Sequence, residues 1–155
     1  LIIGSSFFGK NTDTPFIRKL KSLERSGSGR IIFTGFVKHT EMLVYYAMAD
    51  AGCIPSLWDE PFGLTVAEQM AMELPVVTTD AGAIPEIVDS TCGFICQRDD
   101  QLNKNIASAI TTLSRNRAMC REMGKNGRKI IENRFSCTKY CENWFESVRM
   151  GETKE

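Results

Sequence analysis

Two glutamates in the stretch DEPFGLTVAEQM, residues 59–70, have the residue type and spacing best suited to chemistry. Glu60 precedes a Pro-Phe-Gly turn. Glu68 lies eight positions after Glu60, inside a helical pattern that begins near Thr65. Carboxylates at such places can accept hydrogen bonds from sugar hydroxyls, as acidic residues accept from ribose in dinucleotide-binding folds. Each glutamate also has a plainer interpretation, Glu60 as a solvated loop acid and Glu68 as the far end of a Thr65-x-x-Glu68 capping box. Taken singly, each fits the plainer interpretation better.

The beginning of the helix near Thr65 is a candidate phosphate site. The first amides of a helix have no partner within the helix, and the helix dipole adds partial positive charge at that end. A phosphate or diphosphate would bind there, and Gly63 would let its oxygens approach the backbone closely. No Walker lysine and no G-x-G-x-x-G pattern accompanies it, so an ordinary strand-to-helix turn remains the alternative.

Two further loops carry small residues after an expected strand. Gly35 allows a sharp turn, after which Phe36 and Val37 could offer backbone groups and an apolar surface to a flat base. The plainer interpretation, a turn with two core residues, is the stronger one there. Residues 79–86 (TDAGAIPE) would permit close approach of a ligand or of a facing domain, with Glu86 in the first turn of a short helix.

Size and composition exclude several classes of protein. The 155 residues are 43% hydrophobic and 25% charged, values typical of one soluble globular domain. Lys plus Arg equals Asp plus Glu at 19 each, so no excess charge favours nucleic acid or an anionic membrane. No apolar run approaches the roughly 20 residues that span a bilayer, and the first residues do not form a signal peptide.

The six cysteines do not form a metal motif. None lies in a Cys-x-x-Cys pair, and His39, the single histidine, is far from all of them in sequence. Cys137 and Cys141 lie one helical turn apart, but two further ligands would be needed. We therefore expect no metal, and free thiols in a reducing, cytoplasmic setting.

Short apolar runs alternate with helical patterns along the chain. Strands are expected at residues 1–4, 30–34, 51–55, 74–79 and 93–96. Helices are expected at residues 14–25, from a Thr40 cap through Ala49, at 65–72, at 83–88, at 102–113, at 119–131 and from a Ser136 cap onward. This order predicts an α/β fold, a Rossmann-like, doubly wound parallel sheet followed by C-terminal helices. Such sheets bind ligands beyond the carboxyl ends of their strands, so the loops at residues 5–10, 35–40, 55–64 and 80–85 are the candidate ligand-binding loops.

Together these loops resemble a known family. The segments FTGFV, YYAMADAGCIPS, EPFGLTVAEQMAMELPVVTTDAGAIPEIV and GFIC are similar to the C-terminal, donor-binding half of retaining GT-B glycosyltransferases, family 4. The most specific element is an E-x7-E motif, matched by Glu60 and Glu68. The resemblance implies a donor-binding domain over residues 1–150, incomplete at its N-terminus, and a frayed tail over residues 151–155. The opening on Leu1, without an initiator Met, likewise predicts a fragment of a longer protein.

The resemblance also implies roles for particular residues. Glu60 would contact the donor sugar near the reacting centre, as the catalytic glutamate, and Glu68 would hold the ribose hydroxyls. The remaining donor-binding residues would be Phe36 and Val37 beside the base, and Phe62, Gly63, Leu64 and Thr65 at the diphosphate and sugar. Two features depart from the family: Ala83 replaces a common glycine, and the arginine and lysine that neutralise the diphosphate in relatives would precede Leu1.

The function implied is transfer of a sugar from a nucleotide diphosphate, UDP-linked first and GDP-linked next, to a glycan or lipid-linked acceptor with retention. Surface polysaccharide biosynthesis would be its setting. The acceptor domain, with its usual histidine, would lie outside this chain, and it would make any contact with the inner face of the membrane. His39 is no substitute for that histidine, and the lack of an Asp-x-Asp motif argues against a metal-bridged diphosphate. The alternatives are a non-catalytic nucleotide-sugar-binding or interaction module of the same fold, and another GT-B enzyme such as a sugar-nucleotide epimerase or a phosphorylase.

Overall fold

The structure is a computed structural model that describes residues 1–4, 14–23 and 30–152. Its contacts divide the chain into two compact units, Leu1–Tyr45 and Tyr46–Glu155, and each is described by itself. The predicted loop at residues 5–10 lies outside the described residues. The prediction of one domain over residues 1–150 stays a prediction.

The first unit contains a two-stranded parallel sheet. Its elements are β1 (Ile2–Ile3), α1 (Pro15–Leu23), β2 (Phe33–Gly35), the 3-10 turn η2 (His39–Glu41) and the first part of α2 (Met42–Met48). Ile2 pairs with Phe33 and Ile3 with Gly35, so the second strand lies later than the predicted residues 30–34. The predicted Thr40 cap is wrong, because η2 begins after Lys38 and places Thr40 inside the turn that leads into α2.

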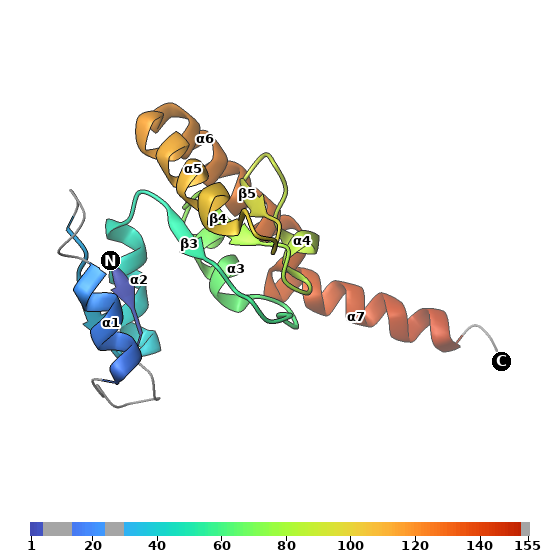
Figure 1. The fold of residues 1–155 in the computed structure, drawn as a ribbon. Helices are drawn as coiled ribbons and strands as arrows, with labels where there is room; N and C mark the ends of the chain where they lie inside the picture. Colours follow the sequence, from blue (N-terminus) through green and yellow to red (C-terminus); the bar gives the residue numbers. More distant parts are fainter. Residues whose placement is uncertain (5–13, 24–29, 153–155) are drawn as a thin grey trace. The chain divides into compact units, whose positions relative to one another are not determined.

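The second unit contains a parallel sheet in the order β3-β4-β5 (Figure 1). Its elements are β3 (Gly52–Ile54), α3 (Leu64–Ala71), β4 (Val76–Thr79), α4 (Ile84–Ile87), β5 (Gly93–Cys96), α5 (Leu102–Arg115), α6 (Arg117–Ile130), the π-helical turn η3 (Ile131–Phe135) and α7 (Cys137–Glu152). Gly52 pairs with Val76, and Thr79 with Cys96, so all three strands end at one edge of the sheet. The strands and helices predicted for this part are confirmed, apart from their exact ends and η3, which was not predicted.

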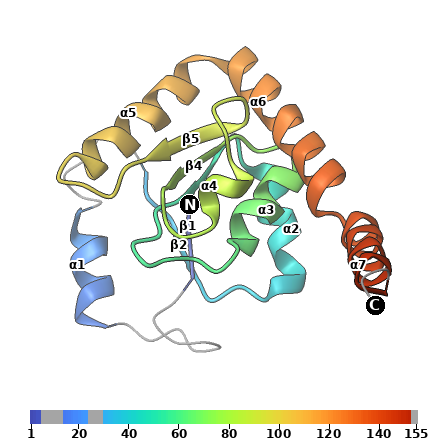
Figure 2. The same cartoon turned by 90° about the vertical axis from the view of Figure 1, so that its right-hand side faces the viewer.

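Helices cover both faces of this sheet (Figure 2). Val66 and Met70 of α3 pack with Val76 and with α4 on one face, whereas Val77 packs with α5 and α6 on the other. Val76 and Val77 are fully buried because successive side chains of a strand point to opposite faces. The predicted α/β class, parallel strands with flanking helices, is therefore confirmed.

Glycines in α6 let this helix lie close to α3 and to the residues that follow it. A Cβ on Gly124 would overlap the carbonyl group of Glu73, and one on Gly127 would come within 3.4 Å of Met70. After η3, Ser136 caps α7 as predicted, its hydroxyl accepting from the Lys139 amide at 3.3 Å. Helix α7 runs through Glu152, two residues into the segment predicted as frayed.

Candidate functional site

Two of the predicted loops meet at the edge where β3, β4 and β5 end. The amide of Ala83, after β4, donates to the carbonyl of Glu60, after β3, at 2.9 Å. Gly82 has φ +56°, and a Cβ there would lie 2.6 Å from the Glu60 nitrogen. Gly82 therefore permits contact between the loop after β3 and the loop after β4. The sequence had suggested that the small residues there would permit contact with a ligand or a facing domain instead.

The side chain of Glu60 is held from the end of its own strand. It is half-buried, and its Oε1 accepts a hydrogen bond of 2.8 Å from Ser56 Oγ. Ser56 is only 4% exposed, and its carbonyl accepts from Thr79 Oγ1 at 2.6 Å, which ties the loop to β4. The Glu60 carboxylate is therefore held in one position by Ser56, unlike the freely solvated loop acid of the plainer interpretation.

Helix α3 begins at Leu64, and Gly63 is its N-cap residue, with φ +92° and ψ 51°. This left-handed conformation suits glycine, and a Cβ there would also lie 3.3 Å from Ile84. The Gly63 carbonyl accepts from the amides of Val66 and Ala67. Among the described residues, no hydrogen bond uses the amides of the first two helical positions, Leu64 and Thr65, so this end can receive an acceptor oxygen.

The capping-box interpretation of Glu68 is wrong. A capping box needs its threonine at the N-cap and its glutamate three positions later, and those places are taken by Gly63 and Val66. Glu68 instead lies one turn after Leu64, half-buried, and its Oε2 accepts a hydrogen bond of 2.9 Å from the hydroxyl of Tyr46. Burial raises the pKa of Tyr46, and the hydrogen bond and charge of Glu68 raise that pKa further, so the phenol stays a neutral donor.

The other predicted residues fall into two groups. Phe62 is anchored beside the core, with its ring 5.5 Å from that of Phe135 in an edge-to-face contact, and this fixes the approach to Gly63. Phe36 and Val37 belong to the first unit, on the segment between β2 and η2, and their predicted contact with a base stays a prediction. Phe36 is 37% exposed.

Three residues that hold this site were not among the predicted ones. They are Ser56, Tyr46 and Arg98. Arg98 follows β5 and donates to Asp59, Asp80 and the carbonyl of Leu57. Its position just beyond a strand's carboxyl end was a signal in the sequence, because β5 ends at the same edge as β3 and β4. Tyr46 carried no such signal, since a tyrosine on an apolar helix face resembles any core residue.

The described parts of the chain offer neither a metal site nor a membrane span. No three His, Cys, Asp or Glu side chains within residues 1–4, 14–23 and 30–152 lie together so as to hold a metal ion. Over the same residues, no helix has the length and apolar character needed to cross a membrane. All six cysteines are free thiols, and burial raises the pKa of Cys92 and Cys96.

Comparison with known proteins shows the family. Residues 1–130 match the family model described as Glycosyl transferases group 1, and the chain belongs to that family. Among curated proteins, it is similar to spore coat protein SA of Bacillus subtilis, 28% identical over 92% of this chain and 38% of that protein. It is also similar to the capsular polysaccharide biosynthesis glycosyltransferase CapM of Staphylococcus aureus, 41% identical over 50% of this chain and 20% of that protein.

Solved structures agree on the fold. Sucrose-phosphate synthase from Thermosynechococcus elongatus superposes with a TM-score of 0.77 at 26% identity, over 99% of this chain and 38% of that one. HepE of Anabaena, solved in complex with UDP, superposes with a TM-score of 0.75 at 24% identity, over 96% of this chain and 40% of that one. The fold is thus that of GT-B glycosyltransferases. The chain spans about two fifths of these proteins and of the spore coat protein.

Proposed function

We propose that this chain is the donor-binding part of a retaining family 4 glycosyltransferase, which moves a sugar from a nucleotide diphosphate to a glycan or lipid-linked acceptor. The observation that carries the proposal is the pair of held carboxylates, Glu60 and Glu68, on either side of an accessible helix start at Leu64. Family membership supports the reaction class, and a GT-B relative solved with UDP supports a UDP-linked donor.

The spacing of these groups suits a nucleotide diphosphate sugar. Glu68 follows Leu64 by one turn, and four residues of helix rise about 6 Å along the axis. The ribose of such a donor is bonded to the diphosphate, so a carboxylate one turn beyond the phosphate-binding amides lies where ribose hydroxyls would be. Glu60 lies before the helix start, on the side left for the sugar.

Each group has a definite part in the transfer. The bond between C1 of the sugar and the diphosphate oxygen breaks, the acceptor hydroxyl oxygen bonds to C1, and its proton is released. Charge develops on the departing diphosphate, which the amides of Leu64 and Thr65 and the positive end of the α3 dipole would stabilise. Glu60 would hold the sugar in place for the reaction, and we assign it no nucleophilic role.

The setting is part of the same proposal. The reaction would take place in the cytoplasm, in surface polysaccharide biosynthesis, with any membrane contact made by the acceptor domain. No metal is expected, since the sequence has no Asp-x-Asp motif through which a metal would bridge to the diphosphate. Binding of UDP-glucose should accordingly be unchanged by EDTA.

Calorimetric titration of the chain with UDP-, ADP-, GDP- and dTDP-sugars tests the proposal. At least one should bind, and Glu68→Ala should weaken the binding of that nucleotide whether or not it carries a sugar. Glu60→Ala should weaken only the sugar-bearing form. Failure of all four classes to bind would favour a non-catalytic interaction module of the same fold.

A further inference from the structure

Arg98 joins the ends of all three strands of the β3-β4-β5 sheet. It lies after β5, and its Nη2 donates to Asp59 Oδ1 at 2.7 Å, on the loop after β3. Its Nε and backbone amide both donate to Asp80 Oδ1 at 3.1 Å, directly after β4. Its Nη1 donates to the carbonyl of Leu57 at 3.2 Å. One planar guanidinium thus reaches two separate loops from a third.

These contacts lie on both sides of Trp58, two positions before Glu60. Arg98 holds the carbonyl of Leu57 and the carboxylate of Asp59, and Asp59 Oδ1 also accepts from the Gly82 amide at 3.2 Å. Trp58, between the two held positions, is 67% exposed and so contributes little core packing of its own. The path of this loop into Glu60 therefore depends on polar contacts, and Arg98 supplies two of them, to Leu57 and to Asp59.

The energetics favour a role in geometry over one in global stability. The Arg98 and Asp59 side chains are 29% and 75% exposed, and ion pairs so open to solvent contribute little to folding. The planar guanidinium group of arginine presents several donors in a fixed geometry, so it can nevertheless fix the relative positions of its acceptors. A lysine at this position would present one ammonium group and could not hold the same three acceptors at once.

We propose that Arg98 is a positioning residue for the sugar end of the donor site, acting through the Leu57–Glu60 loop. This inference rests on the proposed function, because Glu60 is taken to contact the sugar. Without Arg98, the loop would have to be ordered when the sugar binds, and that cost would appear in the affinity for the nucleotide sugar. The affinity for the nucleotide alone, which depends on α3, would hardly change.

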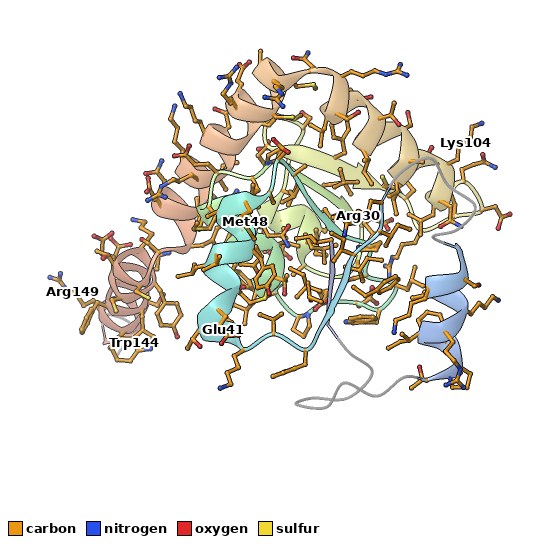
Figure 3. The ribbon with its side chains drawn as sticks, turned by 90° about the vertical axis from the view of Figure 1, so that its left-hand side faces the viewer. Arg30, Glu41, Met48, Lys104, Trp144 and Arg149 are labelled. Atoms are coloured by element: carbon orange, nitrogen blue, oxygen red, sulfur yellow. The ribbon has the colours of Figure 1, made fainter. Side chains whose placement is uncertain are left out.

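Trp58 offers a direct probe of the loop. The chain has two tryptophans, and the other, Trp144, projects from α7 and is 54% exposed (Figure 3). In a Trp144→Phe background, the fluorescence anisotropy decay of Trp58 reports motion of the loop on the nanosecond scale. Arg98→Met should increase the amplitude of the fast component, and Arg98→Lys should not restore the parent value.

Arg128 provides a matched control. Like Arg98, it pairs with a carboxylate, Glu132 at 2.8 Å, and donates to a backbone carbonyl, that of Ala71 at 3.0 Å. The carbonyl of Ala71 lies at the last residue of α3, the end opposite the helix start at Leu64. Arg128→Met should therefore leave both the Trp58 anisotropy and the ligand affinities unchanged.

The binding arm compares UDP-glucose with UDP by calorimetry. The parent protein should bind UDP-glucose more tightly than UDP, and Arg98→Met should weaken UDP-glucose about fivefold and UDP less than twofold. If Arg98→Met keeps the parent preference, or leaves Trp58 as immobile as before, the positioning role is refuted and the proposed function stands. If the parent protein binds neither ligand, the UDP-linked form of the proposed function fails, and this inference fails with it.

Discussion

Replacing Tyr46 by Phe tests whether Glu68 is held in place for a ligand. The substitution removes one hydroxyl, which lies 2.9 Å from Glu68 Oε2, and keeps a ring that is only 5% exposed. A hydrogen bond to a charged group contributes about 1.5–3 kcal/mol, and Glu68 is half-buried, so water can replace part of the loss. We expect the free energy of unfolding to fall by about 1–2 kcal/mol.

The effect on binding separates a positioning contact from a purely structural one. Tyr46→Phe removes one of the contacts that fix the Glu68 carboxylate, and restoring its order on binding should cost up to about 0.5–1.5 kcal/mol, or roughly a two- to tenfold rise in Kd. Glu68→Ala removes the carboxylate altogether and should raise Kd about 10- to 100-fold. The double variant should bind like Glu68→Ala alone, because Tyr46 would act through Glu68.

The assay is calorimetric titration of each variant with UDP and with 2′-deoxy-UDP, the corresponding ADP and GDP pairs being used if UDP does not bind. The parent should prefer the ribonucleotide, Tyr46→Phe should reduce that preference, and Glu68→Ala should abolish it. Tyr45→Phe is the matched control, since the described residues include no hydrogen-bond partner for Tyr45, and it should change neither quantity. Additive effects of the two variants, or an unchanged ribose preference in Glu68→Ala, would refute the assignment.

Three further predictions concern the same unit. The pKa of Tyr46 is raised in the folded protein, so its contribution to stability is complete below the ordinary tyrosine pKa of about 10 and is lost as the pH rises above that value. In urea unfolding, the free energy of unfolding should therefore fall more steeply with alkaline pH in the parent than in Tyr46→Phe. Gly82→Ala should lower the unfolding free energy by at least about 1–2 kcal/mol, from the positive φ and the contact with Glu60; an unchanged urea midpoint would contradict this. The buried Gln69 Oε1 has no hydrogen-bond partner among the described residues, and it occupies the space that a Cβ on Gly52 would take. Gly52→Ala should therefore cost clearly more stability in the parent than in a Gln69→Ala background, and equal costs in this double-mutant cycle would show no coupling.

The strands and helices of the second unit could be predicted because their patterns are local. The run that contains Val76 and Val77 is apolar, β-branched and short, and the structure buries both faces of that strand completely. The predicted start of α3, near Thr65, was displaced from the observed start at Leu64, because the pattern Thr65-x-x-Glu68 fits a capping box. Only the backbone shows that Gly63 takes the N-cap position in a left-handed conformation.

The candidate site was only partly predictable, because its supporting contacts join distant residues. Nothing near Glu68 in the sequence indicates that its hydrogen-bond donor is Tyr46, 22 positions earlier. Tyr46 occurs in an apolar helical pattern and is indeed buried, so its hydroxyl is the one part of it that the periodicity cannot place. Ser56 is similar, since a serine after a strand is common and its bond to Glu60 depends on how the loop turns back.

Arg98 could have been found by applying the strand-end rule to every strand. In a parallel sheet with Thr79 paired to Cys96, the residues after β4 and β5 emerge at one edge, whatever their separation in sequence. The rule is usually applied to residues that touch a ligand. Here Asp80 and Arg98 emerge beside each other at that edge and engage each other, and Arg98 also engages Asp59. The same topology therefore predicts the residues that hold a binding loop together with those that would bind.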